Sequence, residues 1–154
     1  MKKIALLLVT AFMISSFCGC SEKKSNDISE YTFSGSDECL SVSGGLIQLG
    51  GEEEVFSGGE LTILNEKEFD DITSWTTEFY VLADGEKHTV QKNSVIDVDG
   101  GAIVEISGDL GKISGPDIIT DDDFEDSLYF VFTGTHSDGN LYSYEFRMDV
   151  TRVK

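Results

Sequence analysis

The final stretch of the chain alternates strictly between apolar and polar side chains. Its apolar series is Tyr142, Tyr144, Phe146, Met148 and Val150, and its polar series is Ser143, Glu145, Arg147, Asp149 and Thr151. A period of two over ten residues is typical of a strand with one buried face and one hydrated face. We therefore predict one long half-buried β-strand here, and this pattern constrains the fold more than any other in the sequence.

A hairpin is predicted at this end of the chain. Residues 128–133 are apolar on both faces, which is typical of a central strand. Between them and the C-terminal strand lies Asp138-Gly139, a dipeptide that favours a tight turn.

A second hairpin is predicted in the middle of the chain. Residues 75–83 are rich in Thr, aromatic and branched side chains, Asp84-Gly85 provides the turn, and residues 86–91 form the returning strand.

Shorter apolar runs predict further strands. They cover Glu38–Ser43, Leu46–Leu49, Glu60–Asn65, Val95–Val98 and Ala102–Ser107, and glycine pairs at 44–45, 50–51, 58–59 and 100–101 separate them as turns or bulges. Residues 66–72 have room for one helical turn, and no longer helical period follows residue 20. Strands at this spacing predict an all-β domain over residues 31–154, an antiparallel β-sandwich of immunoglobulin-like or similar topology.

The N-terminus has the pattern of a secretory leader. Lys2 and Lys3 form a short positive region, and the uncharged apolar run of residues 4–17 follows it. This run is too short to span a bilayer comfortably but is normal for the hydrophobic region of a signal peptide. Residues 1–19 are therefore predicted to be removed during export.

The end of this run, Phe17-Cys18-Gly19-Cys20, resembles the lipobox of bacterial lipoprotein precursors. The resemblance implies that Cys20 is modified with a lipid and becomes the new N-terminus after cleavage behind Gly19. The rest of the chain resembles lipoproteins of Gram-positive bacteria, which implies no particular activity. The alternative is an ordinary secretory peptide, in which Cys20 is not modified.

Residues 20–30 are predicted to be a flexible tether, because residues 21–30 contain five charged side chains and one apolar residue, Ile28. In the processed protein Cys39 has no cysteine partner, so no intramolecular disulfide is expected. Cys39 is expected to pack as a small apolar residue, with a reactive thiol or an intermolecular link as the alternatives.

The composition is strongly acidic, with 29 Asp and Glu against 11 Lys and Arg and a net charge of −18. This charge argues against a nucleic-acid partner, which needs a basic surface. It also argues against electrostatic attachment to an anionic membrane.

Calcium is one candidate ligand, since carboxylates crowd into residues 121–126. The candidate ligands are Asp121, Asp123 and Glu125 from this segment together with Asp97 and Asp99, with Asp138-Gly139-Asn140 as a further contributor if the fold brings these loops together. The spacing does not fit an EF-hand. A solvated acidic surface is the competing interpretation.

No catalytic pattern is evident in the sequence. His88 and His136 lack zinc spacing, and no Gly-x-Ser-x-Gly motif is present. Adjacent His136, Ser137 and Asp138 do not predict a catalytic triad, because triad members act from separate segments. We therefore expect no enzymatic activity.

Exposed aromatic side chains on a sheet could stack on sugars, so a carbohydrate-binding module is an alternative. Trp75 falls in register with Thr77, Phe79 and Val81 and is therefore expected in the core. Tyr142 and Tyr144 share the apolar side of the last strand, whereas Tyr80 and Tyr129 lie in strands apolar on both faces and are not placed by the pattern.

Together these features predict a lipid-anchored domain on the extracytoplasmic face of the cell membrane. It is expected to act as a binding or structural module for a ligand outside the cell or in its envelope, with a calcium-dependent adhesion or sensor domain and a carbohydrate-binding module as alternatives.

Overall fold

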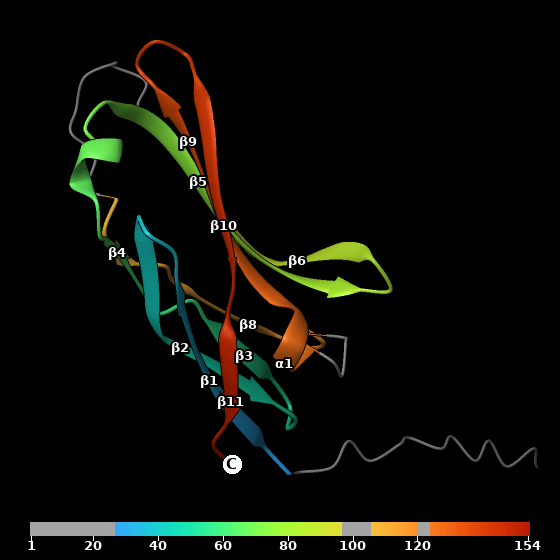
Figure 1. The fold of residues 1–154 in the computed structure, drawn as a ribbon. Helices are drawn as coiled ribbons and strands as arrows, with labels where there is room; N and C mark the ends of the chain where they lie inside the picture. The colour runs from blue at the N-terminus through green and yellow to red at the C-terminus, as the bar shows by residue number, and fades with distance from the viewer. Residues whose placement is uncertain (1–26, 97–105, 120–123) are drawn as a thin grey trace, which may run out of the picture.

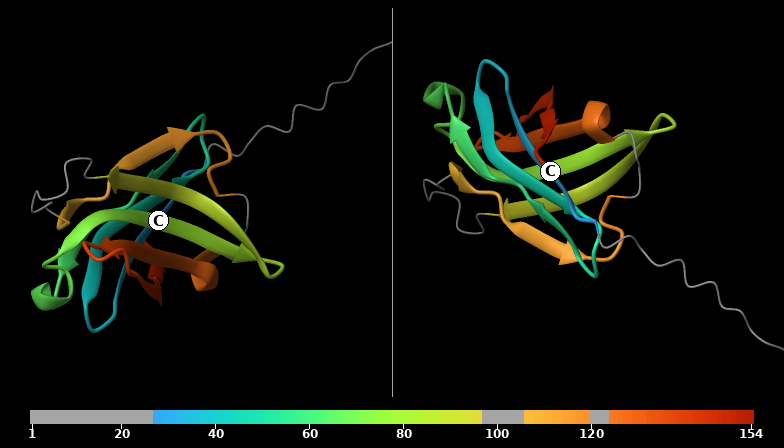
Figure 2. Two further views of the ribbon diagram at one scale, coloured as in Figure 1. Left: turned by 90° about the horizontal axis from the view of Figure 1, so that it is seen from above. Right: turned by 90° about the horizontal axis from the view of Figure 1, so that it is seen from below.

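The computed structural model describes residues 27–96, 106–119 and 124–154. Two antiparallel sheets pack face to face, and their strands cross one another when the molecule is viewed from above or below (Figure 1, Figure 2). The predicted all-β sandwich is therefore confirmed.

The first sheet has seven strands. Its main order is β11 (Asp149–Arg152), β1 (Ser29–Ser36), β2 (Leu40–Leu49), β3 (Glu54–Ser57) and β8 (Lys112–Gly115), while β4 (Glu60–Ile63) also pairs with β2 and β7 (Gly108–Asp109) pairs with β4.

The second sheet has four strands. Their order is β10 (Leu141–Arg147), β9 (Leu128–His136), β5 (Ile72–Ala83) and β6 (Glu86–Ile96). Two short helical turns lead into it, the 3-10 turn η1 (Glu66–Glu68) before β5 and α1 (Phe124–Ser127) before β9.

Both predicted hairpins are confirmed. Asp84 and Gly85 have φ values of 51° and 81°, as a type I′ turn between β5 and β6 requires. Gly139, with φ 86°, donates from its backbone N to the carbonyl of His136 in the turn between β9 and β10. The strands β5 and β9 are longer than predicted, because their paired ends carry polar residues that weaken the apolar pattern. β6 is longer too, since Val95 and Ile96 continue it instead of starting the separate strand predicted at 95–98, of which residues 97 and 98 lie outside the described residues.

The prediction of two separate strands at residues 38–43 and 46–49 is wrong, since β2 runs unbroken through Gly44 and Gly45. At these glycines β2 changes partner on one side: Leu40–Ser43 pair with β4, and Leu46–Gln48 pair with β3. The glycine pair therefore marks an exchange of partners rather than a turn.

The C-terminal pattern is distributed over two strands instead of the single one predicted. β10 belongs to the second sheet and β11 to the first, and Met148 between them donates its backbone N–H to the carbonyl of Leu128 at 2.8 Å. The alternation itself is confirmed, because the apolar series from Tyr142 to Val150 faces the interior throughout. The apolar residues of this one alternating segment therefore face the core from both sheets.

Several elements have no counterpart in the predictions, namely β1, β3, β7, β8 and α1. The predicted tether overlaps β1, since Ser29 and Glu30 already pair with β2. In the predicted strand 102–107, residues 102–105 lie outside the described residues, and Ile106 and Ser107 belong to no strand.

The core between the sheets is dominated by phenylalanine rings. Phe33 and Phe56 stack at 5.3 Å, and Phe79 contacts both Phe56 at 5.1 Å and Phe130 at 5.0 Å. Trp75 is 8% exposed, so its predicted place in the core is confirmed. This cluster joins β1 and β3 of one sheet to β5 and β9 of the other.

The chain enters and leaves the domain at the same end. The backbone of Glu30 donates to the carbonyl of Lys154 at 3.2 Å and accepts from Val153 at 2.8 Å. The turn between β9 and β10 lies at the opposite end of the molecule (Figure 1). In the part of the chain that the structure describes, no helix combines the length and apolarity needed to cross a membrane.

Candidate functional site

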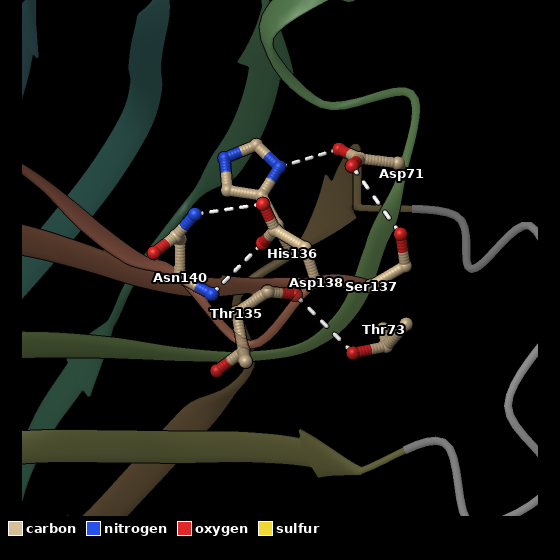
Figure 3. Close-up of polar contacts among 7 residues, drawn as sticks. All are labelled: Asp71, Thr73, Thr135, His136, Ser137, Asp138 and Asn140. Atoms are coloured by element: carbon tan, nitrogen blue, oxygen red, sulfur yellow. Dashed lines mark hydrogen bonds and ion pairs between the residues drawn. The ribbon is translucent and has the colours of Figure 1, made fainter.

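The end remote from the chain termini brings His136 and Asp71 together (Figure 3). Asp71 directly precedes β5, and Ile72 pairs with His136 at the end of β9. The Nδ1 of His136 contacts Oδ1 of Asp71, while Ser137 donates its backbone N–H to the carbonyl of Asp71 at 2.9 Å and its hydroxyl to the Asp71 carboxylate at 3.5 Å. The turn is thereby tied to the start of β5.

This arrangement differs from a catalytic triad. A triad needs a hydrogen bond from the nucleophile to the base, and the base is oriented by the acid. Here both Ser137 and His136 contact the same carboxylate, and no contact between described residues joins the two directly. These contacts hold the turn after β9 against Asp71, at the start of β5.

Asp138 is engaged within its own turn. It accepts hydrogen bonds from the backbone N of Asn140 at 2.9 Å and from its Nδ2 at 2.7 Å (Figure 3). The backbone hydrogen bond from Asn140 is the main reason why the pKa of Asp138 lies below its usual range. The carboxylate is therefore held in its ionised form by local donors.

The calcium candidates do not form a described site. Asp97, Asp99, Asp121 and Asp123 lie outside the described residues, and no group of metal-binding side chains large enough for an ion occurs within the described ranges. Glu125 is exposed on α1, before β9, whereas Asp138 and Asn140 follow β9. Nine residues of strand separate these two places by about 30 Å, so they cannot share one ion.

The tyrosines that the pattern left unplaced lie on the outer face of the second sheet. Tyr80 and Tyr129 are directly opposed on β5 and β9, and their rings stack at 5.2 Å with an angle of 10°. The ammonium group of Lys87 lies 4.3 Å from the centre of the Tyr80 ring, which is 5% exposed. Burial, aided by the negative charge of Glu145, raises the pKa of Tyr80 to about 12.

This tyrosine pair gives little support to sugar binding. Stacking on a sugar needs a free aromatic face. One face of Tyr80 lies against Tyr129, and Lys87 also covers the ring. Lys87 in turn donates to Glu78 at 2.9 Å. The Tyr80 ring and the Lys87 ammonium group are therefore already engaged by neighbouring side chains.

A small pocket contains the other histidine. It has a volume of about 210 Å³ and is lined by Val81, His88, Thr89, Val90, Asp117, Ile118 and Ile119. Such a volume lies below the usual range for small-molecule sites.

A larger groove lies beside β6, next to residues 106–111. Its volume is about 410 Å³. It is lined by Trp75, Thr77, Asn93, Val95, Ile106, Ser107, Gly108, Asp109, Leu110 and Gly111. An aromatic and aliphatic wall with a few polar groups is typical of a small-ligand site.

The walls of this groove are fixed by hydrogen bonds. The carbonyl of Leu110 accepts from Nε2 of Gln91 at 2.8 Å and from Nδ2 of Asn93 at 2.7 Å. From the other side, the backbone N of Leu110 donates to the carbonyl of Gly59, and Gly58 donates to the carbonyl of Gly111, both at 2.9 Å. The segment over the groove is therefore held to both sheets.

Close packing keeps this arrangement tight. A Cβ at Gly58 would lie 2.7 Å from Cβ of Leu110 and 2.9 Å from the Phe79 ring. Only glycine therefore fits where the first sheet approaches the segment at Leu110.

The sequence predictions assigned none of these residues to a binding site. Trp75 was expected in the core and is buried there, and a small part of its side chain borders the groove. Asn93 and Asp109 had no distinguishing pattern, because a polar residue on an edge strand and an Asp beside a glycine are common in any β protein. Cys39 is a free, half-buried thiol packed against the core, away from the groove.

A scan against models of protein families gives no match for this chain, and searches of curated proteins and of solved structures give none either.

Proposed function

We propose that the protein is a lipid-anchored binding module on the extracytoplasmic face of the cell membrane and that it catalyses no reaction. The support from the sequence is the leader that ends in Gly19-Cys20 and the charged segment that follows it. The observation that carries the proposal is the placement of the groove in the half of the domain remote from the point of attachment.

The strand register defines this placement. At the attachment end, Ser29 of β1 pairs with Leu49 of β2. The groove is bounded by β7, and β7 pairs with β4. β4 in turn pairs with residues Leu40–Ser43, at the end of β2 remote from Leu49. A tether at the first end would therefore leave the groove open to the surroundings.

Two matched cysteine substitutions test the anchor. In the native host, Cys20→Ala should abolish incorporation of a labelled fatty acid and release the protein from the membrane fraction. Cys18→Ala, which removes a thiol two residues earlier, should leave both properties unchanged. Labelling of the Cys20→Ala protein at the wild-type level, or a wild-type protein without lipid, would overturn the proposal.

A further inference from the structure

We infer that Asp84 is a site of spontaneous isomerisation to isoaspartate, and that the fold protects Asp138 from the same reaction. Each of these residues is followed by a glycine and lies in the turn of a hairpin. Access does not distinguish the two sites, because a Cβ at Gly85 or at Gly139 would meet no atom within 4 Å. The inference goes beyond the proposed function and depends on neither the anchor nor the groove.

The reaction needs only the chain and water. The backbone nitrogen of the glycine attacks Cγ of the aspartate and forms an N–C bond. The hydroxyl of the protonated carboxyl group leaves with the amide proton as water, and the product is a five-membered succinimide. Water then opens this ring at either carbonyl, which restores aspartate or yields isoaspartate, in which the main chain continues through Cγ. One water molecule is lost and one is regained, so no oxidant or reductant is required.

The turn at Asp84 leaves the attacking nitrogen available. Ala83 and Glu86 are the closing pair of β5 and β6, so the two residues between them form a type I′ loop. The hydrogen bond that closes such a turn joins the carbonyl of Ala83 to the N–H of Glu86 and does not use the N–H of Gly85. Asp84 and Gly85 are both exposed, so solvent reaches the reacting atoms.

The turn at Asp138 engages the same groups. The backbone N of Gly139 donates to the carbonyl of His136 at 2.9 Å. The carboxylate of Asp138 accepts from the backbone N of Asn140 at 2.9 Å and from its Nδ2 at 2.7 Å (Figure 3). These bonds must break before the nitrogen can attack Cγ. The backbone hydrogen bond from Asn140 also lowers the pKa of Asp138, which reduces the protonated form from which water leaves.

Isoaspartate in place of Asp84 changes the end of the hairpin. Its main chain contains one extra carbon atom, so the loop loses the two-residue geometry that sets the pairing of Ala83 with Glu86. Lys87, which donates to Glu78, follows this pair directly. The isomerised protein is therefore expected to melt at a lower temperature than the unmodified protein.

Prolonged incubation of the full lipoprotein near neutral pH tests the inference, with one sample folded and one denatured in guanidinium chloride. Trypsin places Asp84 and Asp138 in different peptides, residues 68–87 and 113–147. Asp99-Gly100, which lies outside the described residues, falls in a third peptide. Electron-transfer fragmentation locates isoaspartate within each peptide.

In the folded protein Asp84 should isomerise about tenfold or more faster than Asp138, because hydrogen bonds must open only at the second site. In guanidinium chloride the two rates should be similar, since both sites then have only their Asp-Gly sequence in common.

A matched pair of substitutions tests the role of the glycine. Gly85→Asn places a residue that tolerates positive φ in the turn, but its side chain hinders the attack, so isomerisation at Asp84 should fall several-fold. Gly139→Asn makes the same change in the other turn and should leave the rate at Asp84 as in wild type. Equal melting temperatures would show that both variants are folded.

The inference is overturned if the folded protein forms no isoaspartate at Asp84, or if Asp84 and Asp138 react equally fast in the folded state. It is also overturned if their difference persists in guanidinium chloride, because the neighbouring sequence and not the fold would then be the cause. A wild-type rate in Gly85→Asn would contradict attack by the backbone nitrogen of residue 85.

Discussion

Gly45 lies in β2, which pairs with β1 in the first sheet. It is directly opposite Phe33, and a Cβ at this position would lie 2.1 Å from Cε2 of the Phe33 ring. Phe33 is 2% exposed and stacked on Phe56, so the ring has no space to withdraw. The absence of a side chain at residue 45 is therefore a requirement of the packing.

Gly45→Ala should lower the free energy of unfolding by about 1–3 kcal/mol, which is the usual effect of overpacking a core. The matched control is Gly115→Ala at the end of β8, where a Cβ meets no atom within 4 Å and the backbone is not left-handed. The control should stay within about 0.5 kcal/mol of wild type. Urea denaturation measures both, and equal stabilities of the two variants would contradict this account of Gly45.

At the scale of the element, the β5–β6 hairpin is fastened by Glu78. Its carboxylate accepts from Thr89 Oγ1 at 2.6 Å and from Lys87 Nζ at 2.9 Å. Burial alone would raise the pKa of Glu78, but the hydrogen bonds and the nearby lysines outweigh it, and the pKa lies below its ordinary value of 4.5. The ionised form is thus favoured by the fold.

A lowered pKa in the folded state means that the stabilising contribution is present above the pKa of the unfolded chain and is lost as pH falls through the folded value. Glu78→Gln should therefore reduce stability near neutral pH by about 1 kcal/mol. The difference from wild type should shrink as the pH falls below 4.5 and should disappear once Glu78 is protonated in the folded protein. Chemical denaturation across this range measures it.

Glu53→Gln, in the exposed turn before β3, is the control for loss of one negative charge. It should show no such dependence on pH. A constant difference between wild type and Glu78→Gln at all pH values would mean that ionisation is not what stabilises the hairpin.

Elements formed by local sequence could be predicted, and those that depend on a distant partner could not. The type I′ turn at Asp84-Gly85 and the apolar stripe of Trp75 are encoded within a few residues. The continuity of β2 through Gly44-Gly45 depends on β3 and β4 replacing one another as partners. Similarly, nothing in the regular alternation indicates that β10 and β11 belong to different sheets.

The groove shows the same limit. Trp75, Asn93 and Asp109 come from β5, β6 and β7, and their meeting depends on how the second sheet, with β5 and β6, packs against β7 of the first. The sequence provides the residue types, whereas the pairing of β7 with β4 provides their positions.

At the scale of the whole molecule, the dominant property is negative charge. With 29 acidic and 11 basic side chains, the chain repels itself in its compact state. Dissolved salt screens this repulsion, since the screening length falls from about 30 Å at 0.01 M to about 8 Å at 0.15 M.

Raising the sodium chloride concentration over that range should therefore increase the melting temperature by a few degrees, equivalent to about 1 kcal/mol. Chloride is the suitable anion, because sulfate stabilises most proteins by exclusion from their surfaces. Calorimetry measures the change. A fall in the melting temperature would show that attractive ion pairs, such as Glu78 with Lys87, outweigh the net repulsion.

The position of β1 has a mechanical consequence. It lies between β2 and β11, and its first residues lead directly to the segment that joins the domain to the N-terminus. A force applied there along the strand would load the ladders on both edges in shear, so that many hydrogen bonds would have to break at once. The entry point of the domain therefore has the strand geometry that best resists a pulling force.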